Sequence, residues 1–160
     1  MKKRLFAALG AVCTVVSLSA EIGPPTDIAT RAKGAGRIVV ARVLDVHAEF
    51  ATNRFGDQLI VSTALLDVNE TLKGAPAATL QVAVEGGTVG DLTLKVSDLP
   101  ALKAGDKAVF FLDDGPSNVL SPHDRGRGIL MLSDTDRVEN SAVTLDDVRQ
   151  QVRAAIGGAR

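Results

Sequence analysis

Alternation of apolar and polar side chains over two long stretches predicts a pair of β-strands. In RIVVARVLDVHAEF, residues 37–50, one face carries Val39, Ala41 and Val43, and the residues between them form the other face. Branched side chains of this kind suit a pleated surface. The stretch QLIVSTALLDVNETLKG, residues 58–74, has the same character. Turn-forming residues in the intervening ATNRFGD predict an antiparallel hairpin.

The second of these strands changes its pattern before it ends. Ala64, Leu66 and Val68 share one face, and Glu70 then falls on that face. Because side chains alternate with a period of two, such an interruption indicates an extra residue in the strand. We therefore expect a β-bulge over residues 69–71.

Further strands are expected along the middle of the chain. TLQVAVE and LTLKVS alternate, which predicts strands with one wet face. AVFFL, residues 108–112, is apolar throughout and predicts a strand buried on both sides. Short strands should follow around NVLS and GILMLS. The side chains predicted to point inward are Leu80, Val82, Val84, Leu92, Leu94 and Val96.

The end of the chain has a helical period instead. In TLDDVRQQVRAAIGG, Thr144 precedes Asp147 by three residues, an arrangement typical of a capping box. Apolar residues then recur at helical spacing as far as Ile156, before a Gly-Gly stop. The sequence predicts one amphipathic helix within residues 140–160.

These elements together predict an all-β domain with one C-terminal helix. The expected architecture is an OB-like antiparallel β-barrel, closed or partly open, over residues 37–139. Residues 21–36 contain Gly-Pro-Pro and end near Gly34 and Gly36. This segment is predicted to be a flexible lead-in with at most a turn or two of helix.

The first twenty residues have the pattern of a secretory signal peptide. Lys2, Lys3 and Arg4 precede an apolar run that ends in small residues at Ala20. The run is too short for a membrane span, which needs roughly 20 apolar residues. A lipid anchor on Cys13 is an alternative interpretation. The protein is therefore expected to be exported, either to the periplasm or out of the cell.

Removal of this segment changes the composition of what remains. The 140 remaining residues contain no cysteine, so neither a disulfide nor a thiol nucleophile is available. They carry 15 Lys and Arg against 19 Asp and Glu, and they lack Tyr and Trp. Nucleic acid is an improbable ligand for such a chain, because phosphate binding needs a basic face and base stacking needs aromatic rings.

Motifs for catalysis or for binding metals and cofactors are weak. The two histidines, His47 and His123, show no zinc-ligand spacing, and the Ser-Pro-His-Asp run lies too close together in sequence to form a triad. Close aspartate pairs in turns do not continue into a calcium-loop pattern. We predict no catalytic residue, metal or cofactor. Loop residues expected to contact a partner are Asn53, Arg54, Phe55, Arg125 and Arg127.

Three motifs suggest a family. IVVARVLDV, LLDVNETLKG and VEGGTVGDLTLKVSDLPALKAGDKAVFFL, in that order, resemble a family of small exported bacterial proteins and, more remotely, the netrin-like domain of tissue inhibitors of metalloproteinases. The resemblance spans residues 38–112 and implies an OB-type barrel that presents loops to partners. Those inhibitors approach the protease zinc with an N-terminal cysteine, which this chain lacks after residue 20.

Two main functions remain open from the sequence. The first is an exported, non-enzymatic module that binds another protein, a secreted protease being one candidate, through the first hairpin and the barrel loops. The second is a small hydrolase that gathers Asp and His residues from separate loops. A structural role at the cell envelope is a further alternative. The oligomeric state is not predicted.

Overall fold

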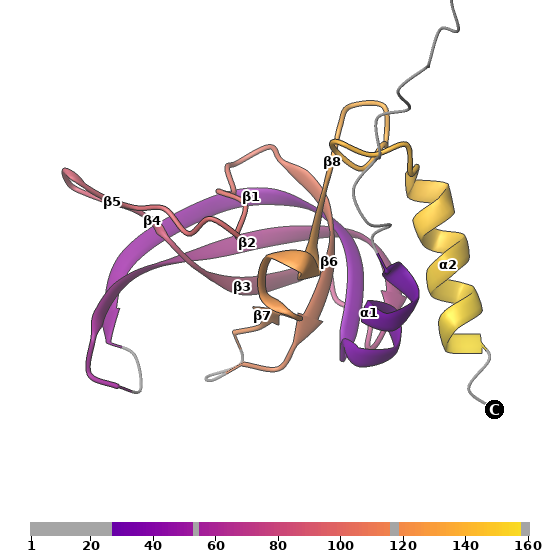
Figure 1. The fold of residues 1–160 in the computed structure, drawn as a ribbon, viewed down its shortest axis with the longest axis horizontal. Coiled ribbons are helices and arrows are strands. Elements are labelled where there is room, and N and C mark those ends of the chain that lie inside the picture. The colour runs from indigo at the N-terminus through magenta and orange to yellow at the C-terminus, as the bar shows by residue number, and fades with distance from the viewer. Residues whose placement is uncertain (1–26, 53–54, 116–118, 158–160) are drawn as a thin grey trace, which may run out of the picture.

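A computed structural model describes residues 27–52, 55–115 and 119–157, so the predicted signal peptide lies outside the described part of the chain. In Figure 1 a curved sheet extends to one side of two helices. The elements are α1 (Ile28–Gly34), β1 (Arg37–Thr52), β2 (Gln58–Lys73), β3 (Thr79–Glu85), β4 (Gly87–Val89), β5 (Leu92–Leu94), β6 (Lys107–Asp113), β7 (Ser121–Pro122), the 3-10 helix η2 (Arg125–Gly128), β8 (Ile129–Leu132) and α2 (Leu145–Gly157).

The main sheet is antiparallel, with strand order β3-β2-β1-β6-β7 and with β8 also paired to β6. Strand ladders do not close this sheet into a barrel within the described residues. An isolated bridge joins β3 to Leu120, where Ala83 N donates to Leu120 O at 2.8 Å and Leu120 N donates to Gln81 O at 2.9 Å. The predicted β-rich class with a C-terminal helix is confirmed, whereas the predicted barrel is not established.

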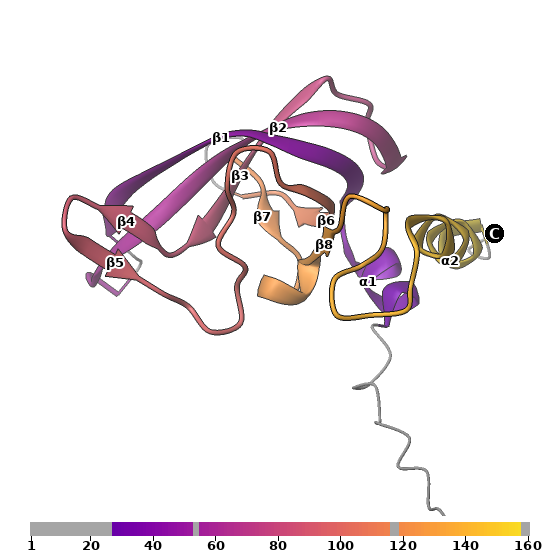
Figure 2. The same ribbon diagram turned by 90° about the horizontal axis from the view of Figure 1, so that it is seen from above.

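The register of the β1–β2 hairpin contains the expected bulge. Val40 pairs with Glu70 and Ala41 pairs with Val68, which leaves Asn69 as the extra residue in β2. Two further irregularities make Leu72 an extra residue in β2 and Leu44 an extra residue in β1. Bulges increase the local twist and bend of a strand pair. They accompany the strong curvature of β1 and β2 that is visible in Figures 1 and 2.

Buried side chains form two hydrophobic clusters on opposite faces of β1 and β6. Val109 and Phe111 point to the face that α1 and α2 cover, and Phe110 points to the face enclosed by the curled sheet. The first half of β1 divides in the same way, with Ile38 and Val40 on the helix side. The prediction that residues 108–112 are buried on both sides is confirmed.

The N-terminal helix is tied to the end of β2 by one lysine. The ammonium group of Lys73 donates to the carbonyls of Ala32 at 2.8 Å, Lys33 at 3.1 Å and Ala35 at 2.6 Å. The last carbonyls of a helix have no partner within it, so a cation is favourable there. The helix also buries Ile28 and Ala32. The described part of the expected lead-in is therefore packed into the core.

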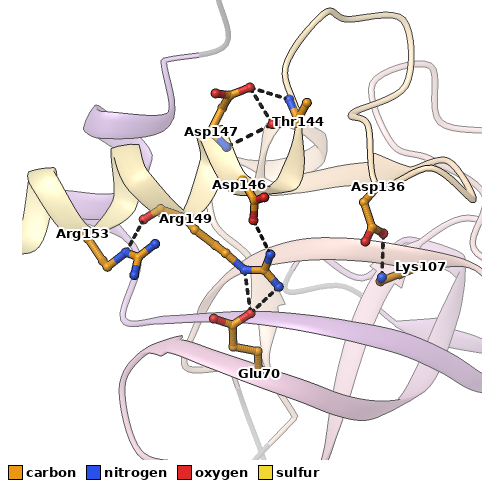
Figure 3. Close-up of polar contacts among 8 residues, drawn as sticks. All are labelled: Glu70, Lys107, Asp136, Thr144, Asp146, Asp147, Arg149 and Arg153. Carbon is orange, nitrogen blue, oxygen red and sulfur yellow. Dashed lines mark hydrogen bonds and ion pairs between the residues drawn. The ribbon is translucent and has the colours of Figure 1, made fainter.

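Polar contacts fix the C-terminal helix at its start and along its side (Figure 3). The backbone N–H of Thr144 donates to the Asp147 carboxylate at 2.8 Å, and Asp147 N donates to Thr144 Oγ1 at 3.2 Å. This reciprocal pair confirms the predicted capping box. Arg149 donates from Nε to Glu70 of β2 at 2.8 Å and from a terminal nitrogen to Asp146 at 2.6 Å.

The stretch LTLKVS departs from its prediction. Only residues 92–94 form a strand, and they pair with β4 in a separate hairpin instead of joining the main sheet. Leu92, which was expected inside, is exposed. The alternating pattern identified a strand correctly, but a pattern alone does not say which sheet the strand joins.

Candidate protein-binding surface

The two halves of the β1–β2 hairpin differ in their surroundings. In the first half of β1, residues 38–41 and Val43 are buried. In the second half, none of residues 44–52 is fully buried. We call the part formed by residues 44–52 and 58–65 the arm. Figures 1 and 2 show that the arm and the β4–β5 hairpin extend to the end of the molecule opposite α1 and α2.

Large apolar side chains are exposed mainly on these projecting hairpins. Phe55 lies in the turn between β1 and β2, Phe50 lies near the end of β1, and Leu92 begins β5. A fourth residue, Leu44, marks the bulge where the arm begins. Exposed fractions are 76% for Phe55, 61% for Leu92, and 47% each for Phe50 and Leu44.

Close backbone contact holds the β4–β5 hairpin against the arm. Gly86 N donates to Ile60 O at 2.8 Å, and Ser62 Oγ donates back to Gly86 O at 2.7 Å. Gly87 has φ +131°, and a Cβ added there would overlap Ser62 Oγ and press on Ala48 at 3.0 Å. A glycine is needed at this position for both its conformation and its size. The two hairpins are therefore positioned relative to each other by β2.

Of the five predicted partner-contact residues, the three that the structure describes do not lie together. Asn53 and Arg54 lie outside the described residues, and Phe55 beside them is exposed. The other two, Arg125 and Arg127, belong to η2. In both Figure 1 and Figure 2 this short helix lies beside β6 and β8, away from the tip of the β1–β2 hairpin.

Arg125 is engaged within the protein. Its Nε donates to Asp98 at 3.0 Å and a terminal nitrogen donates to Glu85 at 3.1 Å. The hydrogen bond to Asp98 is the main cause that raises the pKa of Arg125, and the same bond lowers the pKa of Asp98. Next to it, a Cβ on Gly126 would overlap the Asp98 carbonyl, so the glycine permits η2 to pack closely against this segment.

Arg127 is more open but also serves the fold. Its guanidinium lies 3.5 Å from the Asp124 carboxylate, and its carbonyl oxygen accepts a hydrogen bond from Arg31 at 2.6 Å. Burial is the main cause that lowers the pKa of Arg31, and the nearby charge of Arg127 lowers it further. These contacts link η2 to α1. Of the predicted residues, Phe55 is the described one that the structure places on the projecting end.

The two histidines occupy different environments. His47 is exposed on the arm. His123 Nδ1 lies 2.7 Å from Asp113 Oδ2, and the other oxygen of Asp113 accepts from Gly36 N at 3.2 Å. A Cβ on Gly34 would overlap His123 Nε2. The imidazole is thus held between β6 and the end of α1, and the histidine–carboxylate pair joins these elements.

Neither a metal-ligand cluster nor a helix that could cross a membrane is found in the described part of the chain. Its residues contain no group of three or more His, Cys, Asp or Glu side chains that could hold a metal ion. None of its helices has the length and apolar character to cross a membrane. Comparison with models of protein families and with curated proteins finds no match for this chain.

Sequence reasoning missed three residues of the exposed apolar set. Phe50 shares a face with Val46 and Ala48 in the alternating pattern, and nothing in that pattern marks it as exposed. Leu92 was expected inside because it alternates with polar residues. Leu44 followed Val43 without alternation, and that break was the available signal for the bulge that exposes it.

Proposed function

We propose that this protein is an exported, non-enzymatic module that binds another protein through the ends of its two projecting hairpins. One observation carries the proposal: Phe50, Phe55 and Leu92 are large and substantially exposed on hairpins that extend to the same end of the molecule. Aromatic side chains are frequent anchors of protein interfaces because they bury much apolar area when a partner covers them.

Side chains elsewhere in the molecule that could serve a catalytic site are instead engaged in contacts within the fold. Arg125 and His123, whose chemistry would suit a site, hold η2 and α1 in place through internal contacts. We call the rest of the domain the body. The arm extends from it, and there β6 and the first half of β1 are buried on both faces. A rigid base of this kind limits the conformational entropy that binding would cost.

The finer features of the proposal rest on the sequence. The predicted N-terminal signal peptide supports export, and the motif resemblance supports a netrin-like, partly open OB-type barrel with a secreted protease as partner. The bridge between Val82 and Leu120 is compatible with such a barrel, because it brings the edge strand β3 next to the start of β7.

A hydrolase is the second candidate, and one observation favours it. A histidine hydrogen-bonded to a carboxylate, as in His123 and Asp113, is the pair that orients a general base in many hydrolases. Against it, the second ring nitrogen of His123 faces the backbone at Gly34, where a nucleophile would have to lie. Binding is therefore the better-supported function.

The test uses three forms of the protein: the unchanged protein, F55A/L92A and L44A. Each form is used to capture binding partners from the exported fraction of the source cells. We expect the double variant F55A/L92A to lose a partner that the unchanged protein retains. Leu44 is the matched control, because L44A also removes an exposed apolar side chain but at the base of the arm. Each captured protease is then assayed for inhibition by the three forms.

Two outcomes would overturn the proposal. One is that the unchanged protein captures no partner that F55A/L92A fails to capture. The other is retention by F55A/L92A at the level seen with L44A, which would place binding elsewhere. Hydrolysis by the purified protein that disappears in H123A and D113N would support the second candidate instead.

A further inference from the structure

The arm has a long strand edge with which no described strand pairs. β6 pairs with β1 only from Arg37 to Arg42, and one further pair of hydrogen bonds joins Val43 to Gly105 and Asp106. From Asp45 to Thr52, β1 pairs with β2 on one side. Within residues 27–52, 55–115 and 119–157, no strand pairs with this stretch on its other side.

The outer edges of β3 and β8 in the main sheet are each bridged by another segment of the chain. The outer edge of β3 is bridged by Leu120 through two backbone hydrogen bonds. The outer edge of β8 is bridged at Leu132 by Val138, and Glu139 N donates to Met131 O at 2.9 Å. Unpaired N–H and C=O groups along an edge favour the addition of another strand. The β1 edge of the arm is thus the longest one left open to such addition among the described strands.

Proteins commonly protect open edges with proline, lysine or a bulge within the edge. The stretch DVHAEFAT, residues 45–52, contains neither proline nor lysine. The bulge at Leu44 lies before it, and from Asp45 onward the pairing with β2 is regular. The titratable side chains of this edge are Asp45, His47 and Glu49, and their order determines how two copies can pair.

Antiparallel pairing of two such edges about a two-fold axis at Ala48 matches unlike side chains. Residues whose numbers are equally distant from the axis lie opposite each other on the same face of the sheet. His47 then faces Glu49 of the second copy, and Val46 faces Phe50 of the second copy. A histidine N–H can donate to a carboxylate, and apolar cross-strand pairs are also favourable.

Neighbouring registers lose this match. An axis at His47 places Asp45 opposite Glu49, and an axis at Glu49 places the two Glu49 side chains opposite each other. Like charges directly opposite in a sheet are destabilising. The charge order along this edge therefore disfavours the adjacent alternatives and selects the register centred on Ala48.

We propose that two copies of this protein associate through residues 45–52 of β1, as antiparallel neighbours in one continuous sheet with the two-fold axis at Ala48. The occupant of the open edge is a second copy of this chain. The proposal concerns the edge of the arm and does not depend on the partner protein proposed above. It shares Phe50 with that partner surface, whereas Phe55 and Leu92 lie outside the paired stretch.

Charge exchange tests the register directly. H47E places a carboxylate opposite Glu49, and E49K removes the carboxylate that accepts from His47, so each variant alone should weaken association roughly tenfold because two symmetric pairs are lost. The double variant H47E/E49K creates a carboxylate–ammonium pair at the same two positions and should restore association. An equimolar mixture of the two single variants should form heterodimers. Sedimentation over a range of concentrations measures all four cases.

Circular dichroism and thermal unfolding verify that the variants fold, which is expected because both side chains are exposed. The proposal is overturned by a protein that stays monomeric up to its solubility limit. It is equally overturned by association that H47E and E49K leave unchanged, or that the double variant does not rescue. The proposal is also contradicted if this protein stays monomeric and a strand of a different protein pairs with this edge.

Discussion

The two halves of the β1–β2 hairpin are continuous in sequence and pairing, yet they have different roles. In the first half, β1 lies between two hydrophobic clusters, with Ile38 facing the helices and Val39 facing the interior of the curled sheet. In the arm, β1 has β2 on one side and the short β4–β5 hairpin packed near one face. A single pair of strands thus supplies both the centre of the core and a projecting surface.

This difference shows how a small domain makes room for binding. Stability comes from the part where both faces of the sheet are covered, because burial of apolar area is the main favourable term in folding. The arm can expose Phe50 and Phe55 because the body does not depend on them for its core. Body and arm should therefore respond differently to substitution.

The largest effect is expected for F111A in the body. Phe111 is fully buried in the cluster beneath α1 and α2, so its truncation should cost about 3–5 kcal/mol of unfolding free energy. F50A removes the same atoms from a half-exposed position on the arm and should cost less than about 1 kcal/mol. Urea denaturation of both variants measures the difference. Equal losses would show that the arm is part of the core.

A smaller effect is expected for G87A in β4, which packs against the arm. Gly87 has φ +131° and lies against Ser62 and Ala48, so a methyl group there should cost about 1–3 kcal/mol and displace the β4–β5 hairpin. Gly90 provides the control, because it also has a positive φ, +58°, but has open space around it.

Hydrogen exchange locates this effect. In G87A the amide of Gly86, which bonds to Ile60, should exchange faster, while amides of β6 remain protected. Faster exchange at β6 would mean that the hairpin supports the body as well. An equal response to G90A would assign the effect to backbone conformation alone.

The smallest effect is expected from the cap of α2. Hydrogen bonds from Thr144 lower the pKa of Asp147 below its usual 3.8. A carboxylate with a depressed pKa in the folded state stabilises the protein above its usual pKa, and this contribution is lost as the pH falls through the folded value. The stability difference between the unchanged protein and D147N should therefore be larger at neutral pH than below pH 3.8. A difference that grows on acidification would contradict this origin.

Periodicity predicted the elements of the body well. The faces of the first strand, the bulge at Asn69, the buried strand at residues 108–112 and the capping box of Thr144 and Asp147 are all present. Each depends on local spacing or on a strong contrast between apolar and polar side chains. Such features are decided within a few residues and can be read from a single chain.

The candidate surface was harder to predict because exposure on the arm depends on distant contacts. The alternating pattern around Phe50 continues that of the buried part of β1, yet Phe50 is exposed and lies in the part of β1 beyond Arg42 that β6 does not pair with. Arg125 was expected in an open loop, but Asp98 and Glu85, far away in sequence, bind it. Local sequence does not encode where a neighbouring strand ends.

The hydrogen bonds from Lys73 to three carbonyl groups at the end of α1 make this helix depend on a residue far along the chain. Lys73 follows α1 by some forty residues, and the hairpin must form before its ammonium group can reach Ala32, Lys33 and Ala35. A seven-residue helix is too short to persist alone in water. We therefore expect α1 to become stable only once β2 and the cluster beneath α1 and α2 are in place.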